Sequence, residues 1–313
     1  QVLVFDRVRE NEINREQWKM KVKKGHLPAY MHIYGNINND HDLSLIPEVP
    51  ISTVVHCAGD PPIWNFEAGS SQSEQELDKV HVEGTKKLWD LFEARKHKVR
   101  RFVALSTTDI YGPVEKKFLP YKKKLPLNPM NHWAKSKLKM ENFLKGAWKE
   151  KPKNIQSVGI LRLTTVYGPR QLKHEGLVSH MIHEAMNSRP LPIPARFAQN
   201  SRDFLYVTDL AQSMMSVVQH PRGGLIEAHV GSGAEATLTE LAESIIDLTS
   251  SKSAISYLSS NVHPDVTNQR VDQKKEKFLP EKPVVGLREG LRRTTEHIRK
   301  FEGFGGWTEK TNG

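Results

Sequence analysis

The sequence predicts an α/β protein built on a doubly wound parallel sheet, because short apolar segments alternate with stretches of helical periodicity along the chain. The apolar segments are bounded by polar or turn residues, as buried strands are, and lie at residues 2–5, 30–34, 53–56, 101–105, 158–163, 204–207 and 228–230. Helical periodicity is found at residues 73–94, 133–148, 177–187, 208–219, 237–248 and 287–301. This order is that of repeated strand–helix–strand units.

Length and composition are those of a globular protein that buries a full core. The 313 residues are 37% hydrophobic and 26% charged, and no apolar run approaches the roughly 20 residues that span a bilayer. Cys57 is the only cysteine, which excludes an intrachain disulfide and a cysteine-based metal site, and we expect it to be a buried small apolar residue. The net charge of +10 is compatible with an acidic partner, although a lysine-rich solvated surface explains it more simply. Residues 116–124 are predicted to form an exposed lysine-rich loop.

The N-terminal segment enters a strand pattern directly after Gln1. A dinucleotide-binding fold usually opens with a strand, a glycine-rich turn and a helix, and no segment here matches that glycine pattern. The first strand is central in such a sheet, so its absence leaves buried backbone groups unpaired at roughly 1–3 kcal/mol each. We therefore expect that the first βα unit is absent from this chain and that the natural protein carries about 25–30 further residues upstream.

Six phrases in the sequence carry a family resemblance when they are taken in order and at their spacing. They are VVHCAG at 54–59, VEGT at 82–85, STTDIYG at 106–112, LRLTTVYGPR at 161–170, RDFLYVTDLA at 202–211 and GLREGL at 286–291. Together they resemble the extended short-chain dehydrogenase/reductase family, of the NAD-dependent epimerase/dehydratase type. The resemblance runs over nearly the whole chain.

The resemblance implies a Rossmann-type dinucleotide-binding domain with a smaller C-terminal substrate lobe. We expect the Rossmann domain to comprise residues 1–170, completed by about 204–230, and the substrate lobe to comprise residues 171–203 and 231–313. The implied cofactor is NAD or NADP, unless binding has been lost. Asp6 favours NAD because a carboxylate repels the 2′-phosphate of NADP, although Arg7 beside it weakens that argument.

The implied cofactor site lies at the carboxyl ends of the strands, where ligands bind in doubly wound sheets. Its predicted members are Asp6, Arg7, Asn36, Cys57, Ala58, Gly59, His81 and Lys137. Two of them depart from the family pattern, which often has Asp where Asn36 stands and Asn where His81 stands. Asp6 has an alternative role as a helix cap or ion-pair partner.

The implied catalytic residues are Thr107 and Lys137, with Trp133 at the position of the family's tyrosine. Spacing of four residues places Trp133 and Lys137 on one helical face. An indole cannot titrate in water, and loss of a positioned acid/base typically costs about 10²–10⁴-fold in rate. His132 lies about 100° further round the helix and should face elsewhere. The alternatives are that Thr107 only caps a loop and that Lys137 is a surface lysine.

The predicted substrate residues are Thr108, Asp109, Arg170 and Arg202. Asp109 falls where dehydratase relatives carry an acidic acid/base residue, and an arginine at position 202 pairs with diphosphate in sugar-nucleotide relatives. A nucleotide-sugar-like ligand is therefore implied. The alternative for Arg202 is a structural ion pair with Asp203 or Asp209. No metal site is predicted.

Three functions remain open from the sequence. The first is a catalytically impaired protein, with or without a bound cofactor, that acts as an accessory subunit of a larger complex, in a mitochondrial or other organellar matrix rather than the cytoplasm. The second is an active NAD-dependent nucleotide-sugar epimerase/dehydratase or hydroxysteroid-type dehydrogenase with a relocated proton carrier. The third is an RNA-associated protein, which the basic charge suggests but which the lack of an aromatic-interleaved basic platform disfavours.

Overall fold

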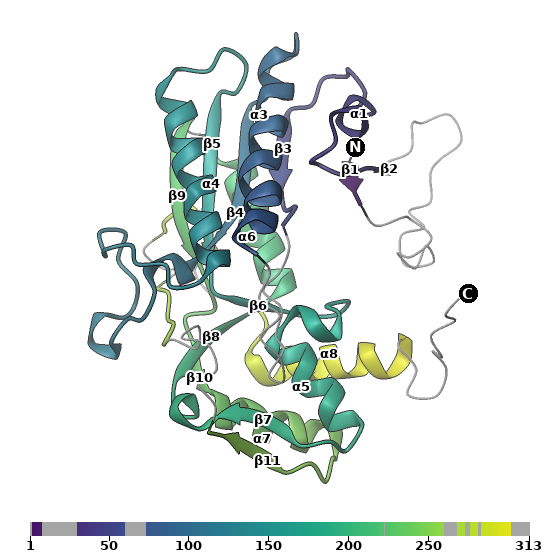
Figure 1. The fold of residues 1–313 in the computed structure, drawn as a ribbon, viewed down its shortest axis with the longest axis vertical. Helices are drawn as coiled ribbons and strands as arrows, with labels where there is room; N and C mark the ends of the chain where they lie inside the picture. Colours follow the sequence, from purple (N-terminus) through teal and green to yellow (C-terminus); the bar gives the residue numbers. More distant parts are fainter. Residues whose placement is uncertain are drawn as a thin grey trace.

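A four-stranded parallel sheet forms the centre of the protein, in a computed structural model that describes residues 2–7, 30–59, 73–221, 223–259, 268–272, 276–280 and 283–301. The strand order is β3-β4-β5-β9 (Figure 1). The strands are β3 (Thr53–His56), β4 (Arg101–Thr107), β5 (Ser157–Leu163) and β9 (Gly224–Val230). All neighbouring pairs are parallel, which confirms the α/β class and the parallel sheet predicted from the apolar segments.

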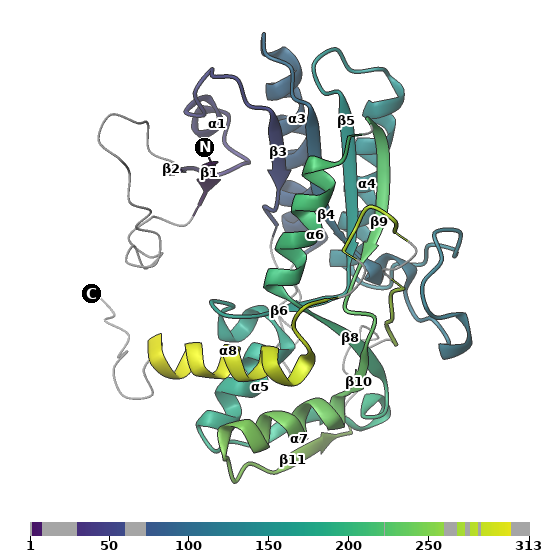
Figure 2. The same ribbon diagram turned by 180° about the vertical axis from the view of Figure 1, so that it is seen from behind.

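Helices cover both faces of this sheet. The helices α3 (Gly84–Ala94) and α4 (His132–Lys149) lie on one face, and α6 (Val207–Gln219) lies on the other (Figures 1 and 2). Alternate residues of β4 point to opposite faces, so that Phe102 packs in the core under α3 and α4 while Val103 packs with Val217 of α6. The sheet is therefore doubly wound, as predicted.

The strands β1 (Val2–Asp6) and β2 (Tyr30–Tyr34) form a separate parallel pair. Within the described part of the chain, neither strand is hydrogen-bonded to the central sheet. Leu3 and Phe5 nevertheless pack against the apolar core that underlies α3 and α4. The short helix α1 (Asp40–Ser44) follows β2, and Asn39 caps its first turn by accepting a hydrogen bond from His41 N at 2.9 Å.

The helix predicted at residues 73–94 is interrupted by a π-helical turn. It consists of α2 (Glu74–Asp78), the π turn η2 (Lys79–Glu83) and then α3. Ser73 and Glu76 form a capping box that fixes its start. The wider turn places both His81 and Val82 in the interior, and π turns of this kind are frequent at functional sites.

The remaining strands and helices build a smaller lobe below the central sheet in Figure 1. One sheet has the order β10-β8-β6, and the parallel pair β11-β7 forms another. The strands are β6 (Thr165–Tyr167), β7 (Leu191–Pro194), β8 (Ser201–Tyr206), β10 (Glu235–Thr237) and β11 (Ile255–Leu258). The helices are α5 (Leu177–Met186), α7 (Leu238–Thr249) and α8 (Leu287–Phe301), and they pack around one apolar core.

The strand predicted at residues 204–207 is wrong in its bounds. The observed strand β8 begins at Ser201, and Val207 already starts α6. Strand β8 pairs with β6 and β10 of the smaller lobe rather than with a strand of the central sheet, whereas α6 packs on the central sheet and β9 is one of its strands. The exact division of the chain into two domains stays a prediction.

Short helical turns and exposed loops complete the fold. The turns are η3 (Thr108–Tyr111), η4 (Lys116–Phe118), η5 (Lys173–Glu175) and η6 (Ala195–Phe197). The lysines of the predicted loop at 116–124 are exposed, but Tyr121 within it is buried and stacks on Tyr111 with ring centroids 4.9 Å apart.

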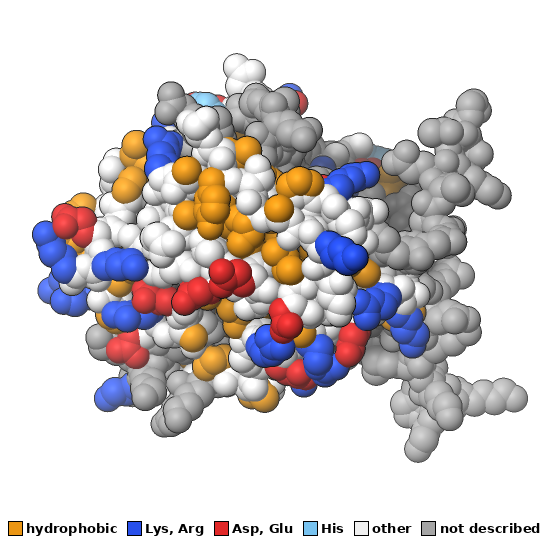
Figure 3. Space-filling model, turned by 90° about the horizontal axis from the view of Figure 1, so that it is seen from below, with side chains coloured by type: hydrophobic (Ala, Val, Ile, Leu, Met, Phe, Trp, Pro, Cys, Tyr) orange, Lys and Arg blue, Asp and Glu red, His pale blue; other side chains and the backbone are white. Residues whose placement is uncertain are grey.

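Seen from below, apolar side chains gather in the middle of one face with acidic and basic side chains beside them (Figure 3). None of the described helices has the length and apolar character needed to cross a bilayer.

Candidate functional site

The predicted cofactor and catalytic residues meet at the carboxyl ends of the parallel strands. Asp6 ends β1, Cys57 and Gly59 follow β3, and Thr107 ends β4. A Cβ atom built on Gly59 would lie 3.1 Å from Nζ of Lys137, so the glycine backbone lies directly beside that ammonium group. The charges of Lys137 and Asp6 both act on the Cys57 thiol, which places these groups in one neighbourhood.

Lys137 is held inside the protein by helix α4. Asn131 caps the helix by accepting a hydrogen bond from Ala134 N at 2.6 Å, and this fixes the register of the buried face that carries Lys137. The ammonium group donates to the carbonyl oxygen of Leu105 at 3.2 Å, and the residue is only 7% exposed. The alternative of a surface lysine is therefore wrong.

The residues after β4 form a tight turn whose hydroxyl groups are partly used by the backbone. Thr107 Oγ1 accepts a hydrogen bond from Asp109 N at 3.0 Å, which caps η3. Thr108 Oγ1 donates to the carbonyl oxygen of Leu163 at 3.1 Å. The capping alternative for Thr107 is therefore observed, but accepting this bond leaves the hydroxyl proton of Thr107 available to donate to a ligand oxygen.

His81 takes part in a buried contact between the π turn and helix α4. Its Nδ1 lies 2.6 Å from Ser136 Oγ, which itself donates to the carbonyl oxygen of Trp133 at 2.8 Å. Because the serine proton is directed at Trp133, Nδ1 of His81 is the donor to Ser136. His81 thus fixes the turn of α4 that carries Trp133 and Lys137. The imidazole also lies beside Gly59, since a Cβ there would be 2.9 Å from Nε2.

The positions of Trp133 and His132 on helix α4 agree with those predicted from the helical spacing. Trp133 is half-buried on the face of α4 that carries Lys137. His132 is exposed and lies 3.3 Å from a carboxylate oxygen of Glu74, so it faces away from the site as the helical spacing predicts.

Four of the predicted cofactor positions lie at the surface. Cys57 is exposed, so the expectation of a buried apolar cysteine is wrong; the residue lies just beyond the end of β3, where the chain has left the sheet. Ala58 and Arg7 are exposed as well. Asn36 is exposed, and its side-chain oxygen accepts a hydrogen bond from Asn38 N at 2.9 Å, which stabilises the turn after β2.

His56 is a buried residue of the site that the sequence did not single out. Its Nε2 lies 2.7 Å from Thr85 Oγ1, which donates to the carbonyl oxygen of His81. His56 is therefore the donor to Thr85. Burial, assisted by the charge of Lys137, lowers the pKa of His56 to about 3, so the imidazole is neutral. The sequence of β3, TVVH, gave no signal for its burial, and only the fold revealed its partner.

The predicted substrate residues Asp109 and Arg202 are brought together from the two lobes. Nη2 of Arg202 lies 3.6 Å from Oδ1 of Asp109. The alternative partners of Arg202 are wrong, because Asp203 accepts from the backbone N–H groups of residues 232 and 233, and Asp209 accepts from those of residues 284 and 285. Arg170 is exposed on the turn after β6 with a φ of 71°.

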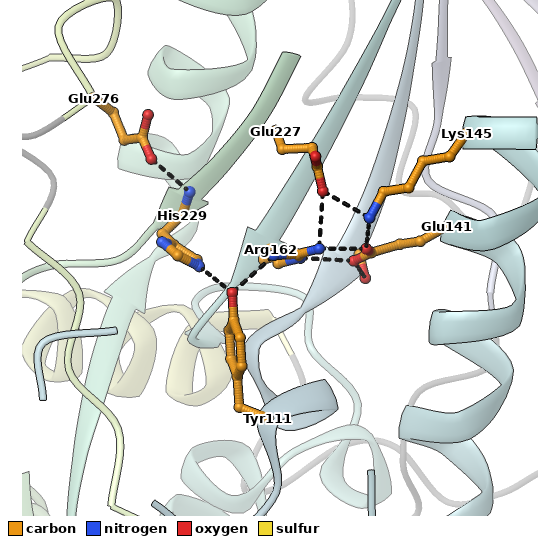
Figure 4. Close-up of polar contacts among 8 residues, drawn as sticks. Tyr111, Glu141, Lys145, Arg162, Glu227, His229 and Glu276 are labelled. Carbon is orange, nitrogen blue, oxygen red and sulfur yellow. Dashed lines mark hydrogen bonds and ion pairs between the residues drawn. The ribbon is translucent and has the colours of Figure 1, made fainter. Parts of the chain in front are cut away.

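A buried polar network supports the site from behind (Figure 4). Arg162 of β5 makes two hydrogen bonds to the carboxylate of Glu141, at 3.0 and 2.7 Å, and a third to the Tyr111 hydroxyl at 2.7 Å. Glu141 lies one helical turn after Lys137 and also accepts a bond from Ser106, the neighbour of Thr107, at 2.7 Å. The network therefore ties α4 to the end of β4.

The same network holds a neutral histidine. Nε2 of His229 lies 2.7 Å from the hydroxyl of Tyr111. Burial, assisted by the charge of Arg162, lowers the pKa of His229 to about 4, and burial raises the pKa of Tyr111. The residues of this network were not predicted, because they are spread over four segments of the chain.

The sequence profile of the NAD dependent epimerase/dehydratase family matches residues 6–231, which is more than half of the chain. The protein belongs to this family. It is similar to the dTDP-D-glucose 4,6-dehydratase of Homo sapiens, with 30% identity over 286 residues that cover 89% of this chain and 77% of that protein. It is also similar to UDP-glucuronic acid decarboxylase 1 of Arabidopsis thaliana, with 27% identity over 71% of this chain and 50% of that protein.

Two solved structures of epimerase/dehydratase proteins share the fold. The dTDP-glucose 4,6-dehydratase of Bacillus anthracis, in complex with NAD, has a TM-score of 0.75 at 25% identity and covers 96% of this chain and 88% of its own. The UDP-glucose 4-epimerase of Thermus thermophilus, also with NAD, has a TM-score of 0.76 at 21% identity and covers 96% of this chain and 92% of its own. The Rossmann-type fold and the family predicted from the six phrases are thereby confirmed, and NAD is favoured over NADP. Among the described residues, no group of His, Cys, Asp or Glu side chains is arranged to hold a metal ion.

Proposed function

We propose that this epimerase/dehydratase-family protein binds NAD and a nucleotide sugar and acts on the sugar ring. The observation that carries the proposal is the buried ammonium group of Lys137 beside the backbone of Gly59, at the end of the strand that bears Thr107. The names of the relatives, which include dTDP-glucose dehydratases and UDP-glucose epimerases, support a nucleotide sugar as the ligand.

The residues of the site fit a dinucleotide on two grounds. Gly59 has no side chain where a Cβ would approach His81 at 2.9 Å and Lys137 at 3.1 Å, so its backbone can lie close to the ammonium group that would hold the nicotinamide ribose. Asp6 ends β1 at the same edge, where a carboxylate holds ribose hydroxyl groups and repels a 2′-phosphate. Lys137 would then hold the nicotinamide ribose. Bound NAD would supply an acceptor for a hydride from a sugar carbon.

The protein's own groups have separate roles in this proposal. The Thr107 hydroxyl donates a hydrogen bond to a sugar oxygen, and the Lys137 ammonium stabilises negative charge that develops there. Trp133 cannot exchange a proton, because the indole N–H does not titrate in water. Asp109, two residues after Thr107, is the ionisable group that we assign as the proton acceptor. We expect turnover to be about 10²–10⁴-fold slower than in a homologous enzyme that has a tyrosine at the position of Trp133.

The first test measures NADH binding by nicotinamide fluorescence. Lys137→Met should weaken NADH binding at least about tenfold, because a buried cation that contacts the cofactor is removed. Lys139→Met is the matched control on the same helix, since Lys139 is exposed and pairs with Glu74 and Asp78. No binding by the wild-type protein at millimolar NADH would rule out the proposed function.

A second candidate function is a catalytically silent accessory subunit of a larger assembly in an organelle. The observation in its favour is Trp133 in the place of the acid/base residue, with His81 and Asn36 departing from the family pattern as well. We propose other protein subunits as its partners. Turnover of dTDP-glucose or UDP-glucose separates the two functions: activity in the wild-type protein favours the enzyme, whereas activity that arises only in Trp133→Tyr favours the silent subunit.

A further inference from the structure

Four side chains from separate segments close a ring of polar contacts between the two lobes. Asp109 Oδ1 lies 3.6 Å from Nη2 of Arg202, and Nε of Arg202 donates to Thr165 Oγ1 at 3.0 Å. Thr165 Oγ1 donates to Oε1 of Gln269 at 3.1 Å, and Nε2 of Gln269 donates back to Oδ1 of Asp109. Each contact in the ring joins one donor group to one acceptor group.

Gln269 is held rigidly in this ring. Its backbone N–H donates to the carbonyl oxygen of Ser201 at 2.9 Å, and Ser201 N donates to the side-chain oxygen of Asn268 at 3.0 Å. The hydroxyl of Tyr121, from the loop of the other lobe, donates to the carbonyl oxygen of Asn268 at 3.2 Å. Because Oε1 of Gln269 is occupied by Thr165, its amide N–H group must point at Asp109.

Within the ring, the Arg202 guanidinium is buried more deeply than the Asp109 carboxylate. Arg202 is 3% exposed and Gln269 is 1% exposed, whereas the Asp109 side chain is 19% exposed. An anionic ligand that approaches Arg202 therefore meets the carboxylate of Asp109 first. The charge of Arg202 is also already balanced at short range, so a ligand must displace a carboxylate to reach it.

We propose that Asp109 and Gln269 form a latch on Arg202, which the diphosphate group of a nucleotide ligand opens by taking the guanidinium away from Asp109. The latch rests on the proposed function for its ligand and adds a regulatory step to it. Once Arg202 is engaged by phosphate, Asp109 remains held by Gln269 and becomes available as a proton acceptor only when the ligand is in place. Asp109 is thus a specificity-determining residue that selects multiply charged ligands over singly charged ones.

The test measures binding of uridine diphosphate and thymidine diphosphate by isothermal titration calorimetry with NAD present. Asp109→Asn keeps an oxygen for Gln269 but removes the charge that holds Arg202, so it should tighten binding of one of the two nucleotides by roughly tenfold or more. Glu235→Gln is the control, because Glu235 pairs with Arg270 at 3.7 Å in the same lobe and should change binding less than about twofold. The double variant Asp109→Asn with Arg202→Gln should lose the gain.

Each outcome bears on the latch or on the proposed function. Nucleotide binding that is equal or weaker in Asp109→Asn than in the wild-type protein would overturn the latch while the proposed function stands. A gain that persists in the double variant would overturn it too, because the effect would not pass through Arg202. Absence of nucleotide binding in the wild-type protein and in a folded Asp109→Asn protein would overturn both, since the open latch exposes the guanidinium.

Discussion

The buried histidine His56 makes stability depend on pH in a way that can be calculated. The neutral imidazole is favoured in the folded protein, where its pKa is about 3, whereas the ordinary pKa of a histidine in an unfolded chain is 6.5. The unfolded chain therefore binds the additional proton as pH falls below 6.5, and this stability is lost progressively down to about pH 3. Linkage between the two pKa values gives a loss of about 2–3 kcal/mol in the free energy of unfolding from pH 7 to pH 4.5.

The perturbation is His56→Gln, because a glutamine amide can still donate to Thr85 but does not titrate. We expect the variant to lose about 1–2 kcal/mol at pH 7 through imperfect packing, but to lose about 2–3 kcal/mol less than the wild-type protein between pH 7 and pH 4.5. The assay is urea unfolding followed by circular dichroism at both pH values.

His229 gives an independent comparison within the same protein. Its folded pKa of about 4 gives a loss of similar size, about 2–3 kcal/mol, over the same interval. The two histidines lie on β3 and β9, three interstrand spacings or roughly 14 Å apart, so their effects should add. The reasoning is refuted if His56→Gln keeps the wild-type dependence of unfolding free energy on pH within about 0.5 kcal/mol.

Two further predictions concern the network behind the site and the cofactor edge. Glu141→Gln should lower the free energy of unfolding by up to about 3–5 kcal/mol, because it removes one of the two carboxylates, Glu141 and Glu227, that pair with the buried Arg162, whereas Glu141→Gln with Arg162→Met should recover a large part of that loss in urea unfolding. Equal stability of the single and double variants would contradict this. Gly59→Ala should weaken NADH binding about tenfold with little change in melting temperature, because the new Cβ must move His81 or Lys137. The control is Gly146→Ala on α4, where a Cβ meets nothing within 4 Å. This variant should raise the free energy of unfolding by up to about 1 kcal/mol and leave NADH binding unchanged. An equal loss of NADH affinity in both variants would show that Gly59 does not lie at the cofactor site.

The sequence by itself determined the parallel sheet, most of the helices and the family. Buried strands and amphipathic helices leave local patterns, since side chains alternate every two residues in strands and recur every three or four in helices. This is why the helix predicted at residues 287–301 is observed as Leu287–Phe301. It is also why Trp133 and Lys137 were placed correctly on one face of α4, four residues apart.

Other features were decided by the tertiary structure alone. The sequence did not predict the π turn that buries His81, because one extra residue in a helical turn leaves no periodic signal. As the alternative to a substrate-binding role, the sequence suggested an ion pair of Arg202 with Asp203 or Asp209, whereas the structure pairs Arg202 with Asp109, which lies 93 positions away and cannot be found from a local pattern. The hydrogen-bond partner of a buried polar group depends on which strand ends the fold brings together at one edge of the sheet. The packing of the whole core determines which strand ends become neighbours, so no single segment of the sequence contains this information.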